Sequence, residues 1–316
     1  MFNRIKKVLY KLGALKTYEH IDRMRYLRRL RKPDTGDWRY ASADDAAQFV
    51  GGEVVVRWSG IPVPVLFYCD PGSLIERDII KHGAFRPAIL ELLGWYARPE
   101  TLVLDVGANV GVYAVALARM EPEVQIHCFE PNPDMAARLE RNVRLNRVHD
   151  SVHIHAAAAS DVAGRTTFHV VPRGGGNQGL SALRKDALGQ TPSAPIEVET
   201  VTLDETFLAQ ERTVSAIKID VQGSELDVLN GARRLIERDR PVVVFEHEDA
   251  LHPDASDALA RKRAIGALFA ALDYEVLYVS RRGTDLFAPV AWERALNGDL
   301  LALPLGPRPT CTRPPR

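Results

Sequence analysis

The chain has 316 residues, 46% of them hydrophobic and 26% charged, an ordinary composition for a globular protein that is large enough to bury a sizeable core. Lysine plus arginine number 41 and aspartate plus glutamate number 41, so the zero formal net charge argues against a protein that binds polyanions over its whole surface. The three cysteines lie far apart without a Cys-x-x-Cys pair, which argues against a disulfide framework or a thiolate zinc site and favours a reducing, cytoplasmic location. No apolar run approaches the roughly 18 residues of a membrane-spanning helix.

Residues 1–32 are strongly basic although the whole chain is neutral. They contain eleven lysines and arginines and two acids, a balance of +9 that leaves −9 for residues 33–316. Apolar residues recur in this segment at helical spacing, so we expect a basic amphipathic helix that lacks the continuous apolar centre of a secretion signal. Packing of this helix on its own domain or on a partner subunit is the favoured interpretation. Attachment to an anionic membrane surface and binding to nucleic acid are the alternatives.

Residues 33–97 have the pattern of an accessory region. Apolar residues within 53–69 predict two short strands, separated where Gly60 and Pro62 interrupt the run. Helical spacing follows over residues 73–97, and Pro87 suits the first turn of the second of two helices.

Residues 98–303 alternate between short apolar runs and amphipathic stretches. The apolar runs predict buried strands at 101–107, 125–131, 152–160, 216–223 and 241–249. Strands that alternate with helices in this way predict an α/β fold, in which a doubly wound and mostly parallel sheet carries helices on both faces.

Two further segments complete this part of the chain. Residues 166–205 predict an antiparallel excursion with a glycine-rich tip, and residues 262–280 predict a helix followed by an edge strand. Residues 304–316 hold five prolines among thirteen residues, which predicts a disordered tail.

The segment LDVGANVG, residues 104–111, has the pattern of a ligand-binding turn between a strand and a helix. Gly107 and Gly111 let the backbone turn sharply and approach a ligand closely. Their Gly-x-x-x-Gly spacing differs from the Gly-x-Gly-x-x-Gly of a dinucleotide-binding turn, where a pyrophosphate rests on the helix N-terminus. Asp105 would repel such a pyrophosphate, whereas the sulfonium and the amino acid end of S-adenosylmethionine fit a turn with this charge.

A second acid supports the same ligand. Glu130 ends the second strand, 25 residues after Asp105. A carboxylate at this position accepts hydrogen bonds from ribose hydroxyls in nucleotide-binding folds. The combination of strand, DVGANVG turn, helix and FEPNP strand end therefore predicts binding of S-adenosylmethionine.

Five segments resemble, in this order, the FkbM-type methyltransferases: LDVGANVGVYAVALAR, FEPNPDMAARLERNVRLN, AAAASDVAG, VTLDE and IKIDVQGSELDVLNGA. The resemblance covers about residues 98–250. It implies a class I, Rossmann-like methyltransferase domain that uses S-adenosylmethionine and typically methylates a hydroxyl oxygen. The family more often has glutamate where this chain has Gln222, so we leave Gln222 out of the catalytic set.

The resemblance also implies roles for residues along the cofactor. It places one group at the methionine end, a second at the ribose and a third near the adenine. These are Asp105, Gly107, Ala108, Asn109 and Gly111 for the methionine end, Glu130, Pro131 and Asn132 for the ribose, and Ser160 and Asp161 for the adenine. We therefore expect four parts, namely a basic helical segment at 1–32, the accessory region at 33–97, the methyltransferase domain at 98–303 and the tail at 304–316.

Polar residues at the ends of the fourth and fifth strands are the catalytic candidates, because ligands of doubly wound sheets bind beyond the carboxyl ends of the strands. These residues are Asp220, Glu246 and His247. His247 is the preferred base because an unperturbed histidine has a pKa of about 6.5. A divalent metal held by the three is an alternative that we do not favour, since successive strand residues point to opposite faces. Lys218, inside an apolar strand, is expected to be paired or to snorkel.

The leading functional prediction is an S-adenosylmethionine-dependent O-methyltransferase that acts on a hydroxyl of a sugar, glycan, lipid or polyketide-type acceptor. The alternatives are a nucleic-acid methyltransferase, which the pattern does not favour, and a non-catalytic cofactor-binding assembly protein at a membrane surface. The sequence specifies neither one acceptor nor an oligomeric state.

Overall fold

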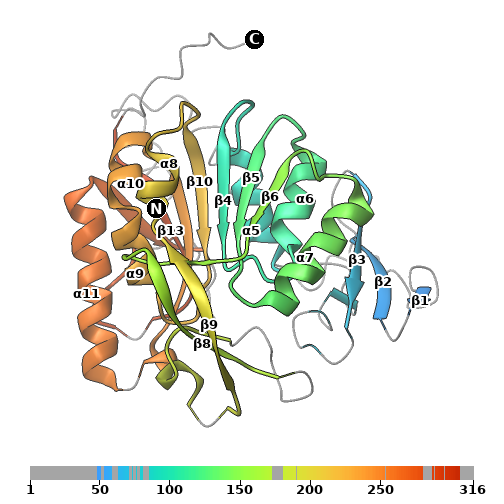
Figure 1. The fold of residues 1–316 in the computed structure, drawn as a ribbon. Coiled ribbons are helices and arrows are strands. Elements are labelled where there is room, and N and C mark those ends of the chain that lie inside the picture. The colour runs from blue at the N-terminus through green and yellow to red at the C-terminus, as the bar shows by residue number, and fades with distance from the viewer. Residues whose placement is uncertain are drawn as a thin grey trace, which may run out of the picture. The chain divides into compact units, whose positions relative to one another are not determined.

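A computed structural model describes most of the chain from residue 48 onward (Figure 1). The described residues are 48–50, 53–58, 63–70, 73, 76, 79–80, 85–172, 181–189, 191–252, 254–279, 287, 289–294 and 296–306. The predictions for residues 1–32, for the glycine-rich tip at 173–179 and for all but the first three residues of the tail lie outside the described residues.

The described part of the accessory region forms a small antiparallel sheet and includes a helix that leads into the main domain. The sheet has the order β1 (Gln48–Val50), β2 (Glu53–Trp58) and β3 (Val65–Cys69), and the helix is α5 (Pro87–Tyr96). The two expected strands are confirmed as β2 and β3, and Pro87 lies in the first turn of α5 as predicted, where its missing N–H needs no partner.

This small sheet is attached to helix α7 (Pro133–Asn146) by hydrogen bonds to the backbone of β3. Asn146 Oδ1 accepts from Leu66 N at 2.9 Å and Asn146 Nδ2 donates to Leu66 O at 2.7 Å. Asn142 Oδ1 accepts from Tyr68 N at 2.9 Å. Two helix side chains therefore satisfy backbone groups at the edge of β3 that would otherwise lack partners.

The main sheet has seven strands in the order β12-β13-β11-β10-β4-β5-β6. The five strands from β11 to β6 are parallel, and β13 runs antiparallel to both of its neighbours. The strands are β4 (Leu102–Val106), β5 (Gln125–Phe129), β6 (Val152–His155), β10 (Val214–Ile219), β11 (Val242–Glu248), β12 (Tyr274–Tyr278) and β13 (Asn297–Pro304). The predicted α/β fold with a mostly parallel sheet is confirmed.

Helices connect the parallel strands, and a small third sheet has the order β7-β9-β8. The remaining elements are α6 (Val112–Met120), β7 (Ala158–Ala159), β8 (Gly164–Val170), η2 (Asp186–Leu188), β9 (Ala194–Val201), α8 (Leu203–Phe207), α9 (Glu225–Gly231), α10 (Arg233–Asp239), η3 (Asp249–Leu251) and α11 (Ala255–Ala271). The antiparallel pairing of β8 with β9 confirms the predicted excursion.

Three element predictions were wrong in detail. The strand β13 was not expected, and it separates the predicted edge strand β12 from β11. The run at 152–160 forms two strands, because the chain leaves the main sheet after His155 and Ala158–Ala159 pairs with β9 instead. The amphipathic stretch between the strands predicted at 216–223 and 241–249 forms two helices, α9 and α10, that meet at Ala232. Pro304, the first residue assigned to the tail, is the last residue of β13.

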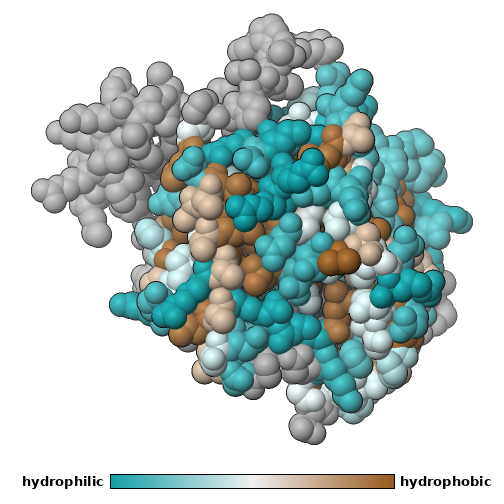
Figure 2. All heavy atoms as spheres, turned by 60° about the vertical axis from the view of Figure 1, so that its left-hand side comes forward, coloured by the Kyte–Doolittle hydropathy of each residue, from teal (hydrophilic) through white to brown (hydrophobic). Residues whose placement is uncertain are grey.

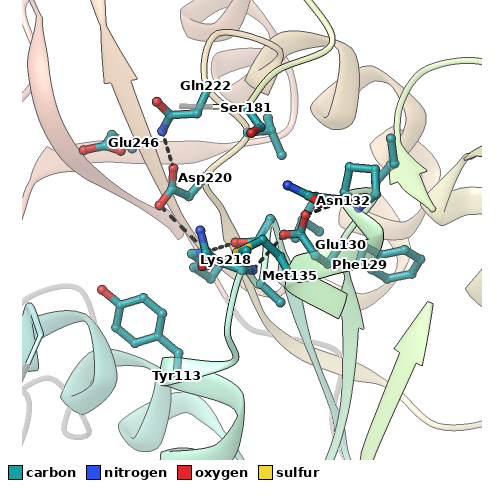
Figure 3. A pocket seen from close by; sticks show the side chains of 18 of the residues that line it. Tyr113, Phe129, Glu130, Asn132, Met135, Ser181, Lys218, Asp220, Gln222 and Glu246 are labelled. Carbon is teal, nitrogen blue, oxygen red and sulfur yellow. Dashed lines mark hydrogen bonds and ion pairs between the residues drawn. The ribbon is translucent and has the colours of Figure 1, made fainter. Parts of the chain in front are cut away.

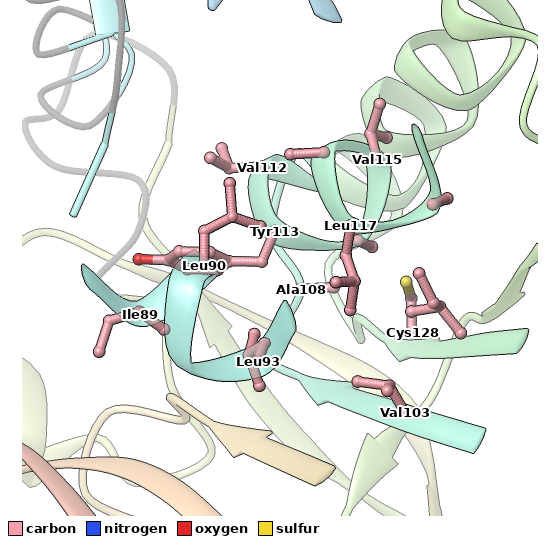
Figure 4. Close-up of a cluster of buried hydrophobic side chains, with 14 of the residues drawn as sticks. Ile89, Leu90, Leu93, Val103, Ala108, Val112, Tyr113, Val115, Leu117 and Cys128 are labelled. Atoms are coloured by element: carbon pink, nitrogen blue, oxygen red, sulfur yellow. The ribbon is translucent and has the colours of Figure 1, made fainter. Parts of the chain in front are cut away.

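Both faces of the main sheet are buried. One face packs with α5, α6 and α7, where Val103 and Cys128 meet Leu93 and Leu117 (Figure 4). The other face packs with α8, α9, α10 and α11. Each large side chain removed from water in this way stabilises the fold by roughly 1.5–3 kcal/mol.

Polar and apolar side chains are interspersed on the face shown in Figure 2. Among the described residues the large hydrophobic side chains that are exposed are Val162 and Leu305, which are far apart in sequence. The part of the chain that the structure describes contains no helix with the length and apolar character needed to cross a bilayer.

Candidate active site

A cavity of about 310 Å³ lies at the carboxyl ends of the parallel strands, where β4, β5, β10 and β11 all contribute side chains or backbone (Figure 3). Its lining includes eight of the residues predicted from the sequence. These are Gly107, Ala108, Asn109, Glu130, Pro131, Asn132, Asp220 and Glu246. The remaining predicted residues, Asp105, Gly111, Ser160, Asp161 and His247, do not line it.

The turn between β4 and α6 brings the backbone against the cavity. Gly107, Asn109 and Gly111 have φ angles of 73°, 51° and 84°, in the left-handed region that favours glycine. A Cβ on Gly107 would lie 1.9 Å from the carbonyl oxygen of Asp220, and one on Gly111 would lie 2.1 Å from Leu139 Cδ1. Gly107 therefore allows the turn to pass β10, whereas Gly111 allows α6 to pack on α7 behind the cavity.

Glu130 holds this turn from the end of β5. Its Oε2 accepts from Asn109 N at 2.8 Å and its Oε1 accepts from Asn132 N at 2.9 Å. Burial raises the pKa of Glu130 to about 7, although the two N–H donors favour the ionised form. Asn132 in turn caps α7, where its Oδ1 accepts from Asp134 N at 3.1 Å. One carboxyl group therefore fixes two loops and still faces the cavity.

Lys218 is paired, as one of the two sequence interpretations predicted. Its Nζ lies 3.1 Å from Asp105 Oδ1 and donates to Gly107 O at 2.7 Å. Burial alone would lower the pKa of Lys218, but the carboxylates of Asp105 and Asp220 raise it. Asp105 was expected to line the methionine end, but its carboxylate faces Lys218 and does not line the cavity. It supports the turn indirectly, through Lys218.

Two carboxyl groups, Asp220 and Glu246, lie at the other end of the cavity (Figure 3). Asp220 Oδ1 accepts from Gln222 Nε2 at 2.8 Å, and Asp220 Oδ2 lies 3.9 Å from Lys218 Nζ. Burial alone would raise the pKa of Asp220, but the cations of Lys218 and Arg86 hold it below its usual value. Burial and the charge of Asp220 raise the pKa of Glu246 to about 8. The pKa values of the two carboxyl groups therefore differ. Asp220 is ionised, and Glu246 is able to exchange a proton near neutral pH.

Arg86 and Asp299 complete this end, and sequence reasoning missed both. Arg86 Nη1 donates to Glu246 Oε1 at 2.7 Å and to Asp299 Oδ1 at 2.9 Å. Tyr113 from the first turn of α6 and Gln222 also line the cavity. The quoted motifs contain Tyr113 and Gln222, but no sequence signal connects Arg86 with Glu246, which is 160 residues away.

Comparisons with known proteins identify the family. The chain matches the Methyltransferase FkbM domain over residues 105–272, which is 168 of its 316 residues. The chain belongs to the FkbM methyltransferase family. It is therefore an enzyme that transfers methyl groups, and the expected class I methyltransferase fold is confirmed.

Individual relatives of this methyltransferase match over part of their length. The 2-O-methyltransferase NoeI of Sinorhizobium fredii is 29% identical over 171 residues, which are 50% of this chain and 68% of NoeI. The 31-O-demethyl-FK506 methyltransferase FkbM of Streptomyces tacrolimicus is 34% identical over 180 residues, which are 49% of this chain and 64% of that protein. The crystal structure of a methyltransferase FkbM from Methylobacillus flagellatus shares 16% identity with a TM-score of 0.40, over 74% of this chain and 60% of that one.

His247 of this methyltransferase does not reach the cavity, contrary to its expected role as the base. Its side chain is 1% exposed and its ring stacks on that of His252 at a centroid distance of 5.1 Å. His247 Nε2 lies 3.4 Å from Asp249 Oδ1. Burial and the neighbouring His252 lower its pKa to about 4. Because side chains alternate along a strand, Glu246 faces the cavity and the adjacent His247 faces away.

The residues expected near the adenine also lie elsewhere. Ser160 Oγ donates to Asp161 Oδ1 at 3.2 Å, and the Ser160 backbone packs against Gly231, where a Cβ would lie 1.9 Å from Ser160 O. The cavity wall on that side is formed by Ala158 and Ala159 instead. Within the described residues no group of three or more His, Cys, Asp or Glu side chains is arranged to hold a metal ion.

Proposed function

We propose that this methyltransferase binds S-adenosylmethionine in the cavity and transfers the methyl group to a hydroxyl oxygen of a small-molecule or glycan acceptor. The observation that carries the proposal is the arrangement of one cavity with the glycine turn and Glu130 at one end and the Asp220–Glu246 carboxyl pair at the other. The first end suits a nucleoside with an amino acid side arm, and the second suits the deprotonation of an alcohol.

The charge of the lining fits this donor. Among the described lining residues four side chains are acidic and two are basic, so the formal balance is −2. Asp220 is held in its ionised form, and an ionised carboxylate in the lining attracts a sulfonium ligand and repels a pyrophosphate. S-adenosylmethionine, when bound, supplies a methyl group on positively charged sulfur.

The protein's own groups carry out binding and proton transfer. Glu130 lines the cavity and accepts hydrogen bonds from the ribose hydroxyls, while Gly107 and Asn109 line the cavity beside the methionine part. The carboxyl pair binds the acceptor hydroxyl and takes its proton as the methyl group moves from sulfur to oxygen. Alignment of the acceptor at roughly 3–3.5 Å and exclusion of water supply the rest of the rate enhancement.

A hydroxyl acceptor is supported by the relatives, since NoeI is named a 2-O-methyltransferase and FkbM a methyltransferase of 31-O-demethyl-FK506. We propose a sugar, glycan, lipid or polyketide-type hydroxyl as the acceptor. The acidic lining disfavours a nucleic acid, because a phosphate backbone near these carboxylates would be repelled. Because the chain belongs to a methyltransferase family, we no longer consider the alternative of a non-catalytic cofactor-binding assembly protein.

The proposal is tested by incubation of the purified protein with methyl-labelled S-adenosylmethionine and a cell extract, followed by mass spectrometry of components that gain one methyl group. We expect label on a hydroxyl oxygen of a neutral component, and tight binding of S-adenosylhomocysteine by calorimetry. Label on nucleic acid only, or binding of NADH in preference to S-adenosylhomocysteine, contradicts the proposal.

For residues 1–32 packing on the domain or on a partner subunit is the favoured interpretation, and peripheral attachment to an anionic membrane is the alternative. The charge balance of +9 in this segment is the support for attachment. Attachment predicts that the full chain sediments with phosphatidylserine vesicles and that a variant without residues 1–32 remains in the supernatant. Equal sedimentation of both forms contradicts attachment.

A further inference from the structure

One nitrogen of Arg86 holds two carboxyl groups on neighbouring strands. Glu246 of β11 and Asp299 of β13 are directly opposite in the antiparallel register, so their side chains lie on the same face of the sheet. Arg86 Nη1 lies 2.7 Å from Glu246 Oε1 and 2.9 Å from Asp299 Oδ1. Two like charges opposite each other destabilise a sheet unless a counterion lies between them, and Arg86 is that counterion.

Arg86 and the second carboxyl group that it holds both lie outside the segment that matches the family. That segment covers residues 105–272, whereas Arg86 precedes it and Asp299 follows it. Arg86 is also held in an uncommon conformation, with φ at 39° directly before Pro87 and the first turn of α5. The neighbouring Phe85 ring contacts the Tyr113 ring of α6 at a centroid distance of 6.3 Å, which anchors this part of the chain at the cavity.

We propose that Arg86 is a positioning residue that, together with Asp299, holds Glu246 as the group that takes the proton of the acceptor hydroxyl. The inference rests on the proposed function, because a proton acceptor is needed only if the methyl group goes to a hydroxyl. It makes the accessory region part of the active site.

The contacts distinguish Glu246 from Asp220 as the proton acceptor. Asp220 is engaged by Gln222 and faces Lys218, so its ionised form is stabilised and it is the weaker base. The pKa of Glu246, raised to about 8 by burial and by Asp220, lies closer to the operating pH of a general base. The charged and titratable groups around Glu246 are Arg86 before α5, Tyr113 of α6, Lys218 and Asp220 of β10, Glu248 of β11 and Asp299 of β13.

The reaction balances without any further reagent. The bond from methyl carbon to sulfur breaks with its electron pair remaining on sulfur, and a bond from methyl carbon to the acceptor oxygen forms. The O–H bond of the acceptor breaks and the proton moves to the Glu246 carboxylate, which then releases it to solvent. Arg86 keeps its protons throughout and acts only through its charge and its two hydrogen bonds.

The test is the pH dependence of kcat/KM for two charge-removing variants, measured with labelled S-adenosylmethionine and the extract acceptor fraction that the wild-type enzyme methylates. Arg86→Gln removes the cation that favours ionised Glu246, so the rising limb of the profile should move to higher pH. An opposite charge at hydrogen-bond distance changes the pKa of a carboxyl group by about 1–3 units. We expect a shift of about one pH unit, the low end of that range, because the Arg86 side chain is 39% exposed. Asp299→Asn removes a like charge and should move the limb to lower pH.

Opposite shifts are a result that a merely structural role does not give. Arg86→Lys retains the charge and should restore the limb most of the way to the wild-type position. Arg144→Gln is the matched control, because Arg144 is 74% exposed in an i,i+4 pair with Glu140 and should leave the profile unchanged. Unchanged limbs in Arg86→Gln and Asp299→Asn, or shifts in the same direction, overturn the inference.

Failure of the proposed function has a different signature. If the wild-type enzyme labels no hydroxyl acceptor at any pH, the proposed function fails and the inference fails with it. If the wild-type enzyme turns over and Arg86→Gln does not fold, as judged by thermal unfolding, the comparison of Asp299→Asn with wild type decides. A limb that does not move to lower pH in that variant overturns the inference.

Discussion

The two ends of the cavity use carboxyl groups in different ways. At the cofactor end each carboxylate has a dedicated partner, with Glu130 accepting from two backbone N–H groups and Asp105 paired with Lys218. At the acceptor end Asp220, Glu246 and Asp299 lie close to one another, and Arg86 bridges Glu246 and Asp299. The first arrangement builds a rigid ligand-binding turn, and the second leaves a carboxyl group poised to exchange a proton.

The two ends also differ in how the chain brings them together. Most of the cofactor end comes from one continuous stretch, residues 105–132, in which a strand, a turn, a helix and a second strand follow in order. The acceptor end joins residues as far apart as Arg86 and Asp299, which are separated by 213 positions. Local geometry therefore fixes the cofactor end, whereas the acceptor end exists only after the sheet has assembled.

The largest expected effect is at the acceptor end. Glu246→Gln keeps the shape of the side chain but removes the proton acceptor, so turnover should fall by about 10²–10⁴-fold. Affinity for S-adenosylhomocysteine, measured by calorimetry, should stay within about twofold, because Glu246 lies away from Glu130 and the turn (Figure 3). The exposed Glu275→Gln serves as the control for a lost carboxylate. If Glu246→Gln turned over at the wild-type rate, Glu246 would not be the group that takes the proton of the acceptor.

The next effect concerns the residue that joins the two ends. Lys218→Met leaves the carboxylate of Asp105 buried and unpaired, so the free energy of unfolding in urea should fall by about 3–5 kcal/mol. Lys185→Met, at an exposed position, should change it by about 0.5 kcal/mol or less. Addition of Asp105→Leu to Lys218→Met should recover part of the loss. Equal stability of the two lysine variants would contradict a buried pair at this position.

A smaller effect is expected when the cofactor end alone is changed. Glu130→Gln leaves one oxygen to serve two backbone donors, and a hydrogen bond to a charged group contributes about 1.5–3 kcal/mol. Calorimetry should therefore show affinity for S-adenosylhomocysteine reduced about ten- to hundredfold, with Glu123→Gln, an exposed substitution, unchanged. Loss of turnover at full affinity would place Glu130 with the acceptor instead.

The same division explains how far the sequence predicted the structure. The strands β4, β5, β10 and β11 and the helices α6 and α7 follow from periodicity and from the glycine and proline positions next to them. The strand β13 could not be found in this way, because its apolar run is short and its place depends on pairing with both β11 and β12. The split of the run at 152–160 likewise depends on β9, which lies about 40 residues later.

The candidate site shows the same limit. Glu130, Gly107 and Asn109 could be predicted because their positions relative to a strand end and a turn determine what they face. Asp220 and Glu246 also follow from the rule that strand ends meet at one edge of the sheet. Arg86 carries no local mark of its role, since only packing of α5 on α6 brings it to β11. Glu246 and His247 are adjacent in a strand, so only one of them can face the cavity. The sequence does not determine which one, because a shift of one residue exchanges the two faces of the strand.

The smallest effect on turnover is expected for His247, which is adjacent to Glu246 in sequence but lies on the opposite side of β11. His247→Gln should keep turnover within about threefold of wild type, because the ring lies outside the cavity. Its effect should appear in stability against pH. The folded-state pKa of about 4 lies below the ordinary histidine value of 6.5, so the unfolded chain binds the proton first as the pH falls.

The contribution of neutral His247 is therefore complete above pH 6.5 and is lost between pH 6.5 and about 4. Over this window urea unfolding should show wild-type stability falling more steeply than that of His247→Gln, by an amount of the order of 1–3 kcal/mol. Parallel curves for the two proteins would mean that the imidazole is not titrated by unfolding. If His247→Gln lost as much turnover as Glu246→Gln, His247 would have to act on the acceptor. That result would contradict the assignment of Glu246 and His247 to opposite faces of β11.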